Sequence, residues 1–363
     1  MAKHRDGPLA RCRAMRGGEL ARFATDVVRP IEPGRAASVL AISGGGKYGA
    51  FSAGYLNGWH ERGDRPRFDV VTGISTGSLM APLAFIESEA STEALESIYT
   101  SVTRKDVYEG RWWINIPFSK SLYDPAPLKK LIETHITRKV INAVAEQGER
   151  RGLYVATVDL GDTRLVIWDL VCLAQEKEYK LFRKVLLAAA AVPMAFPPVK
   201  LKSGLRDDRN RNRWHVDGGL RENVFWRQEL ARLCQAIEAQ RRAADGGAGA
   251  QGAPPATLYA LVNGQLRTRY QEVDFGWVPM IGVARRAVNT LISEVSIGSL
   301  QKLYAETLEA GVRFRFNYVR QFDGSPDWDA FEPDEMRALY EHGRELGRAG
   351  HWEERPPDEP LDG

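Results

Sequence analysis

Short apolar runs alternate with longer mixed segments along the first part of the chain. The run at 37–42 ends in Ser-Gly-Gly-Gly and predicts a buried strand that leads into a turn. The segment 48–59 (YGAFSAGYLNGW) follows with small residues and good helix formers, so it predicts a helix packed close to a sheet. Residues 68–72 predict a second strand, and 78–88 (SLMAPLAFIES) a second helix. This repeat is typical of a parallel α/β sheet with right-handed crossovers.

The later part of the chain continues the same pattern. Two strands are predicted to form a hairpin across Gly161-Asp162, and a helix that follows them is ended by prolines from Pro193 onward. The predicted later elements are strands at 153–159, 164–170, 257–262 and 312–319, and helices at 182–191 and 283–310. We therefore predict a three-layer α/β fold with a mostly parallel central sheet and helices on both faces.

We predict one domain, because no internal repeat and no second segment with its own apolar core is found. It covers 36–320, with an N-terminal tail at 1–35 and a C-terminal extension at 321–363. Two segments within it are predicted to be insertions. These are a charged loop at about 204–214 and a low-complexity linker at 244–256.

Composition narrows the class of protein. The 363 residues are 44% hydrophobic and 27% charged, as in a soluble globular protein. A net charge of +3, without a basic block that carries interleaved aromatic residues, argues against a nucleic-acid partner. The longest apolar run, 185–198, is too short to span a membrane, and the basic N-terminus lacks the apolar core of a secretory signal. We expect a cytoplasmic or peripheral membrane protein, and export of a longer precursor stays open.

The three cysteines, Cys12, Cys172 and Cys234, are isolated along the chain and odd in number. Their spacing predicts neither a disulfide framework nor a zinc site and favours a reducing compartment. We expect no metal and no cofactor.

A candidate nucleophile lies between the second predicted strand and its helix. The segment Gly73-Ile74-Ser75-Thr76-Gly77 has the pattern of a nucleophile elbow, in which flanking glycines permit a sharp turn that exposes the serine hydroxyl. The alternative is a glycine-rich helix start that Ser75 caps.

A serine hydroxyl needs a base to act as a nucleophile. Of the histidines His4, His60, His135, His215, His342 and His351, only His215 lies close to a suitable acid, in His215-Val216-Asp217-Gly218-Gly219. If Asp217 accepts the serine proton directly, no histidine is needed. A supporting role for His215, on the same side of the strand as Asp217, stays open. Taken alone, Asp217 followed by two glycines also predicts a plain turn.

The glycine cluster after the first strand has two interpretations. Gly44, Gly45 and Gly46 can offer backbone N–H donors to an oxyanion that forms during acyl transfer. The spacing Gly44-x-Gly46-x-x-Gly49 also fits a dinucleotide-binding turn. That turn needs an acidic residue about 20 positions further on, whereas the second strand ends here in Val71-Thr72.

Three of these elements, in this order, resemble the motifs of the patatin-like phospholipases. The segment 44–49 is similar to that family's oxyanion loop, 73–77 to its nucleophile motif, and Asp217-Gly218-Gly219 to the motif that carries its dyad aspartate. The Ala- and Pro-rich segment 187–199 is similar to a block that the family carries between the two. The resemblance covers about residues 37–320.

The resemblance implies a Ser75–Asp217 dyad that hydrolyses acyl esters of phospholipids or related lipids without histidine or metal. It implies that Gly44, Gly45 and Gly46 form the oxyanion hole. It also implies structural roles for five other glycines, which are Gly49, Gly73, Gly77, Gly218 and Gly219. One departure is visible, because the family usually has Arg or Lys directly before the last glycine of its first motif. Here Tyr48 fills that place and Lys47 lies one position earlier.

A lipid substrate implies peripheral membrane contact, and exposed apolar groups are expected near the site. The segment 112–118 (WWINIPF) is the candidate lid or membrane-touching segment, with a buried packing loop as an equal alternative. A second candidate is 275–280. The other functions that we weigh are a Ser-His-Asp esterase, a nucleotide- or phosphate-binding protein that uses the GGGKYG turn, and a catalytically silent lipid-binding module. No oligomeric state is predicted.

Overall fold

The structure is a computed structural model. The residues that it describes are 12, 15–16, 36–101, 103–107, 109–110, 121, 123–149, 151–202, 212–225, 256–266, 279–320, 322–325 and 327–357. The candidate segment 112–118 lies outside these ranges, as does 275–280 apart from the first two residues of a helix. Nearly all of the two predicted insertions also lies outside them.

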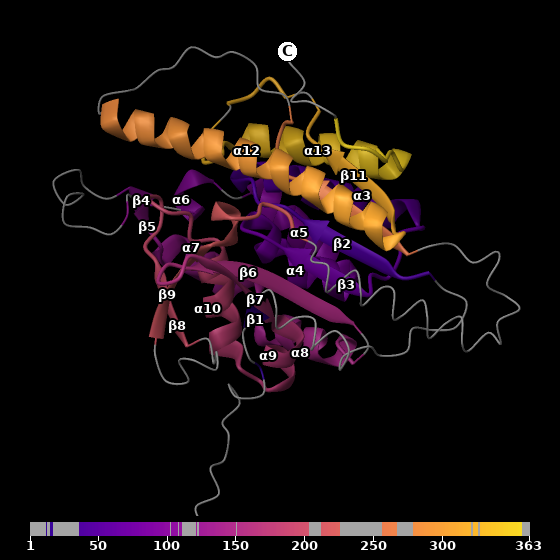
Figure 1. Cartoon of the computed structure of the whole chain (residues 1–363), viewed down its shortest axis with the longest axis horizontal. Coiled ribbons are helices and arrows are strands. Elements are labelled where there is room, and N and C mark those ends of the chain that lie inside the picture. The colour runs from indigo at the N-terminus through magenta and orange to yellow at the C-terminus, as the bar shows by residue number, and fades with distance from the viewer. Residues whose placement is uncertain are drawn as a thin grey trace, which may run out of the picture.

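A mostly parallel sheet forms the centre of the molecule (Figure 1), and the described part of the chain contributes nine strands to it. The path along the sheet is β1-β7-β6-β3-β2-β10-β11, with β9 also paired to β6 and β8 paired to β9. The strands are β1 (Met15–Arg16), β2 (Ser38–Ile42), β3 (Val70–Gly73), β6 (Gly152–Asp159), β7 (Arg164–Asp169), β8 (Val199–Lys202), β9 (Asn212–Asp217), β10 (Thr257–Val262) and β11 (Arg313–Tyr318). A separate short pair joins β4 (Glu109–Gly110) and β5 (Tyr123–Asp124).

Strand directions follow the prediction. From β6 through β3, β2 and β10 to β11 every neighbouring pair is parallel. The pair β6 and β7 is an antiparallel hairpin, and β9 also runs antiparallel to β6. The predicted α/β class with a mostly parallel sheet is therefore confirmed.

The central strands are apolar on both faces because both faces are covered. In β2, Leu40 and Ile42 belong to one hydrophobic cluster, whereas Val39 and Ala41 belong to the other. Side chains alternate along a strand, so a run that is buried throughout indicates packing on both sides.

Helices lie on both sides of the sheet. They are α3 (Gly49–Arg62), α4 (Thr76–Ile86), α5 (Glu89–Ser101), α6 (Arg104–Val107), α7 (Ala126–His135), α8 (Arg138–Gln147), α9 (Leu170–Gln175), α10 (Tyr179–Ala189), α12 (Pro279–Ala310) and α13 (Pro333–Ala349), with short 3₁₀ turns η2 (Gly46–Tyr48) and η5 (Gly218–Leu220). Within the described ranges, no helix is both long and apolar enough to cross a bilayer.

The C-terminal helix α13 packs backbone to backbone on α3. A side chain at Gly54 or Gly58 of α3 would collide with backbone atoms of α13, and one at Gly343 or Gly347 would collide with backbone atoms of α3. Glycines on both helices thus permit a close approach. The packing brings the C-terminal residues beside the helix that begins directly after the glycine cluster.

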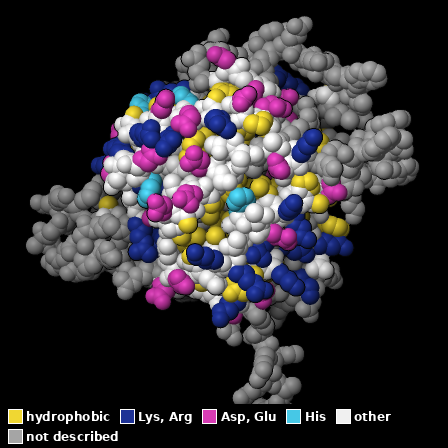
Figure 2. Space-filling view, turned by 180° about the vertical axis from the view of Figure 1, so that it is seen from behind, with side chains coloured by type: hydrophobic (Ala, Val, Ile, Leu, Met, Phe, Trp, Pro, Cys, Tyr) yellow, Lys and Arg dark blue, Asp and Glu magenta, His cyan; other side chains and the backbone are white. Residues whose placement is uncertain are grey.

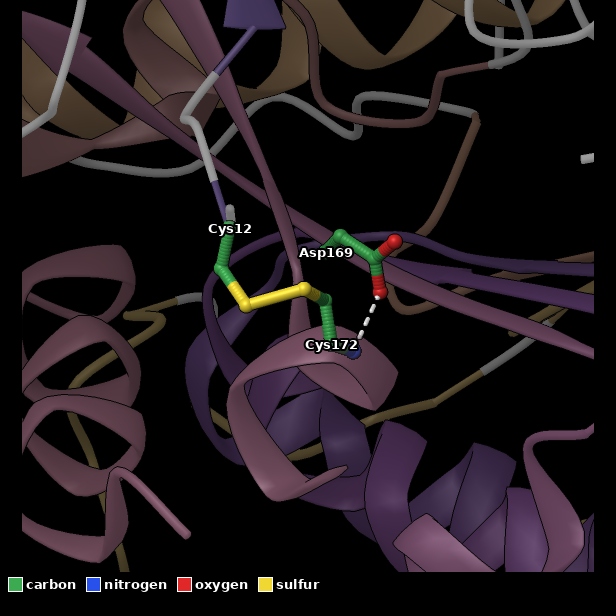
Figure 3. The surroundings of a disulfide bond; sticks show 3 residues. All are labelled: Cys12, Asp169 and Cys172. Atoms are coloured by element: carbon green, nitrogen blue, oxygen red, sulfur yellow. Dashed lines mark hydrogen bonds between the residues drawn. A yellow bond between two sulfur atoms is a disulfide. The ribbon is translucent and has the colours of Figure 1, made fainter. Parts of the chain in front are cut away.

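The prediction made from the cysteines is wrong. Cys12 and Cys172 form a disulfide with a Cα–Cα distance of 5.6 Å (Figure 3). The two residues are 160 positions apart, and β1 brings them together because its Met15 pairs with Ile167 of β7. Cys172 lies at the start of α9, where its N–H donates to Asp169 Oδ1 at 2.9 Å. Since disulfides persist in oxidising compartments, the cysteines do not indicate a reducing one.

Candidate active site

Ser75 lies at the turn between β3 and α4 in a strained backbone conformation. Its φ is 51° and its ψ is −123°, a region that non-glycine residues rarely adopt and that is often found at functional sites. The flanking glycines are required by close contacts, because a Cβ on Gly73 would lie 2.5 Å from the Gly77 carbonyl oxygen. The Ser75 side chain makes no capping hydrogen bond to α4, which argues against a purely capping role.

Asp217 lies at the end of β9 and is buried. Its Oδ1 accepts a hydrogen bond from the Gly219 N–H at 2.7 Å, whereas its buried Oδ2 has no hydrogen-bond partner among the described residues. Burial raises the pKa of Asp217 to about 7, and the interactions with the Ser75 hydroxyl and the Gly219 N–H act in the opposite direction. The Ser75 hydroxyl therefore lies close enough to favour the charged carboxylate, and Oδ2 is the oxygen that has room for a proton.

The glycine cluster lies against Ser75. A Cβ on Gly44 would come within 3.0 Å of the Ser75 Cβ. The Gly44 N–H is already engaged, because it donates to the Asn223 carbonyl oxygen at 3.0 Å. No described residue accepts from the N–H groups of Gly45 (φ 146°) and Gly46 (φ 57°), so these two are available to a ligand.

The other glycines predicted from the sequence lie close to neighbouring residues around Ser75 and Asp217. A Cβ on Gly49 would lie 2.5 Å from Thr76 Oγ1, and one on Gly218 would lie 2.8 Å from the Ala156 carbonyl oxygen. Gly219 supplies the N–H that holds Asp217. The structure thus brings all three predicted motifs together at the carboxyl ends of β2 and β3.

Asn223 connects the glycine cluster to α12 and was not predicted from the sequence. Its carbonyl oxygen accepts from the Gly44 N–H, and its own backbone N–H donates to Ser299 Oγ at 3.0 Å. Its Nδ2 donates to the Ser296 hydroxyl. Nothing in the local sequence marks this asparagine, because its partners are 73 to 179 positions away.

Lys47 points into the protein. It is fully buried, its Nζ forms an ion pair with Glu335 of α13, and it donates to the Ser325 carbonyl oxygen at 2.6 Å. Burial lowers the Lys47 pKa, and the contact with Glu335 opposes this. The Nζ also lies 5.4 Å from the centres of the Tyr48 and Phe322 rings. In this chain the cation of the first motif therefore anchors the C-terminal segment.

An apolar pocket opens beside Ser75. Gly46, Ser75 and Thr76 lie in its wall, and its other wall residues are apolar apart from the Tyr99 hydroxyl. That hydroxyl is hydrogen-bonded to Thr76 Oγ1 at 2.8 Å. The other wall residues are Leu79, Ile98, Val107, Leu128, Leu131, Ala190, Val192, Phe196, Trp328, Phe331 and Met336. This apolar lining suits an apolar ligand chain.

The His215 side chain is buried, and its ring is hydrogen-bonded to a neighbouring buried side chain. Its Nδ1 is hydrogen-bonded to Thr157 Oγ1 at 2.9 Å, and the same oxygen accepts from Trp168 Nε1 at 2.9 Å. Burial lowers the His215 pKa to about 4, so the ring is neutral at pH 7. Within the described residues no histidine lines the pocket, and no group of His, Cys, Asp and Glu there is arranged to hold a metal ion.

The fold and these contacts define an α/β protein with a serine at a strained strand-to-helix turn. The family model for patatin-like phospholipase matches residues 40–230, which is more than half of the chain, and the protein belongs to that family. Membership indicates a lipid acyl hydrolase.

Comparison with solved structures finds the crystal structure of VipD from Legionella pneumophila. The two chains are 11% identical, with a TM-score of 0.37, over 88% of this chain and 67% of VipD. A likeness at that level carries no functional argument. No curated protein matches the sequence.

Proposed function

We propose that the protein is a serine hydrolase that cleaves carboxylic esters of phospholipids or related lipids, with Ser75 as nucleophile and Asp217 as general base. The observation that carries the proposal is the placement of the strained Ser75 turn next to the buried Asp217. A Cβ on Gly218 would lie 2.9 Å from Ile74 Cδ1, and burial raises the pKa of Asp217 to about 7. An aspartate with an ordinary pKa is a weak base at neutral pH, whereas one near 7 is matched to the task.

The first half of the reaction acylates the serine. Ser75 Oγ attacks the ester carbonyl carbon while its proton moves to Asp217 Oδ2, the oxygen that has no hydrogen-bond partner among the described residues. The resulting oxyanion is stabilised by the N–H groups of Gly45 and Gly46, which no described residue occupies. Gly44 contributes to the shape of the loop, because its own N–H is bound to Asn223. When the C–O bond breaks, Asp217 returns the proton to the departing alcohol oxygen.

The second half releases the acid. Asp217 accepts a proton from a water molecule, whose oxygen attacks the acyl-serine carbonyl, and the same N–H pair again holds the oxyanion. The Ser75 Oγ leaves with the proton from Asp217, and the fatty acid is released. The apolar pocket accommodates the acyl chain beside the reacting carbon.

The geometry favours the dyad over a histidine-dependent esterase. His215 is committed to Thr157, and no described hydrogen bond joins it to Ser75 or Asp217. A water-excluding environment around Asp217 supplies the basicity that a histidine would otherwise provide.

The test is fatty acid release from phospholipid vesicles and hydrolysis of a short-chain p-nitrophenyl ester without added metal. We expect Ser75→Ala and Asp217→Asn to lower the rate at least about 10³-fold, while His215→Ala keeps most of the activity per folded molecule. Full activity in Ser75→Ala would reject the proposal. Loss of activity in folded His215→Ala would favour the histidine esterase. An inactive protein that binds nucleotides tightly would favour the phosphate-binding alternative.

A further inference from the structure

Positive charge gathers on the elements next to the pocket. Helices α7, α8 and α10 and strand β8 carry eight exposed basic residues, which we call the cationic face. Figure 1 places α10 and β8 at the lower left, and the reversed view of Figure 2 shows dark blue Lys and Arg side chains gathered at the lower right. The residues of the cationic face are Lys129, Lys130, Arg138, Lys139, Lys180, Lys184, Lys200 and Lys202.

Few acidic groups neutralise this face. Helix α10 and strand β8 contain no acidic residue at all. The acids beside the face are Glu133 of α7, which pairs with Lys129 at 4.0 Å, Glu146 of α8, and Asp106 of α6, which interacts with Lys130. The elements form one surface, since α10 contacts α7 and β8 and the Arg138 guanidinium of α8 lies 5.2 Å from the Tyr179 ring of α10. Basic residues therefore outnumber acidic ones on these adjoining elements.

The same elements build the pocket wall. Leu128 and Leu131 of α7 line the pocket and flank the exposed Lys129 and Lys130. Val192 and Phe196, in the connection between α10 and β8, line it as well. A partner bound to the cationic face would lie next to the pocket.

Exposed apolar side chains accompany the charges. Met194 lies between the pocket residues Val192 and Phe196, is 46% exposed, and has a positive φ of 70°. Trp214 of β9 is 36% exposed, and the Lys200 Nζ lies 4.6 Å from its ring centre. Leu160 is 43% exposed and donates its N–H to the Trp214 carbonyl oxygen at 2.9 Å. Exposed Trp and apolar groups among lysines are suited to a boundary between water and hydrocarbon.

We propose that the cationic face, with Met194, Trp214 and Leu160, docks on the surface of a bilayer that contains anionic phospholipids. The lysines would lie among the negative headgroups, and the apolar side chains would enter the headgroup region beside the pocket mouth. The proposal rests on the proposed function and deepens it. A docked enzyme receives its lipid substrate directly from the bilayer, so the lipid does not have to cross water. A nucleic acid would use the charges but would leave the exposed apolar groups without a role.

The experiment measures flotation with vesicles of phosphatidylcholine alone and of phosphatidylcholine mixed with phosphatidylglycerol. The protein carries Ser75→Ala, so that hydrolysis does not change the vesicles. The test variant adds Lys184→Glu and Lys200→Glu. The control variant adds Arg313→Glu and Arg337→Glu, which change the net charge equally at exposed positions on β11 and α13. Thermal unfolding verifies that both variants are folded.

We expect the parent and control proteins to bind the anionic vesicles more tightly than the neutral ones, and less tightly as salt rises. The test variant should bind the anionic vesicles about tenfold less tightly or worse. Equal binding to both vesicle types, or equal loss in both variants, would overturn the proposal. The proposal would also be overturned if the parent protein bound a DNA duplex but not vesicles, and the test variant lost that DNA binding. Ester hydrolysis by the protein with Ser75 intact is measured in parallel. Hydrolysis without vesicle binding would reject the docking alone, whereas vesicle binding without hydrolysis would reject the proposed reaction.

Discussion

The carboxylate of Asp217 is buried at a strand end, where its pKa rises to about 7, close to the ordinary value of histidine. Two contacts favour its charged form, one with the Gly219 N–H and one with the Ser75 hydroxyl. Burial outweighs both. A buried aspartate beside the nucleophile can therefore perform the task that a histidine performs in a triad.

This pKa predicts the pH dependence of the reaction. Asp217 accepts a proton only when it is deprotonated, so kcat/KM for a soluble ester should rise as the pH rises through about 7 and then level off. The pH–rate profile of the free enzyme measures this directly. His215, with a pKa lowered to about 4, is not the titrating group, so His215→Ala should keep the same inflection. A profile that is already flat above pH 5 would contradict the role given to Asp217.

At the scale of secondary structure elements, much of the site was predictable because its signals are local. The strand before the glycine cluster is a buried run of apolar residues, and the Ser75 turn is bracketed by glycines that its contacts require. The sequence could not show which backbone N–H groups of the glycine cluster are available to a ligand. That depends on the Asn223 carbonyl oxygen, which lies 179 positions from Gly44 and engages its N–H.

The contribution of the C-terminal residues was also hidden from the sequence. Glu335 pairs with Lys47 across 288 positions, and α13 packs on α3 through glycines that carry no recognisable motif. Trp328 lies beyond the region that the family model matches, yet its carbonyl oxygen accepts from the Lys47 N–H at 2.9 Å and its side chain lines the pocket. The C-terminal segment thus forms one wall of the pocket and supports the glycine cluster.

We expect this wall to set the acyl-chain preference. Trp328→Ala removes a large side chain from the pocket, so kcat/KM should shift toward longer acyl chains in a series of p-nitrophenyl esters. The substitution should also cost about 3–5 kcal/mol of stability if the site does not collapse. Trp352→Ala is the matched control, because Trp352 packs on Tyr55 and Trp59 and does not line the pocket. An identical chain preference in both variants and the parent would show that the wall does not select the chain.

At the scale of the whole molecule, the N-terminal residues are tied to the domain by a covalent bond. The Cys12–Cys172 disulfide joins positions 160 residues apart, beside the antiparallel pair of β1 and β7. A crosslink of that span removes many conformations from the unfolded chain. The sequence could not reveal it, since cysteine spacing along the chain carries no information on so distant a pair.

Reduction of this disulfide should lower the stability of the protein. Loop closure over 160 residues corresponds to at most about 5 kcal/mol, so the Tm should fall by several degrees in reductant. Cys172→Ser should have the lowered Tm with or without reductant, whereas Cys234→Ser should respond as the parent does. Thermal unfolding of the three proteins measures this. A parent Tm that is insensitive to reductant would contradict a stabilising role for the bond.

The most direct test of the account is covalent trapping of the nucleophile with a fluorophosphonate, followed by mass spectrometry of the peptides. If Ser75 and Asp217 form a dyad, Ser75 is the one residue that is modified. Labelling should be slower in Asp217→Asn, which lacks the base, and absent in Ser75→Ala. Labelling at another serine that persists in Ser75→Ala, or no labelling of the folded protein, would contradict the assignment of Ser75 as the nucleophile.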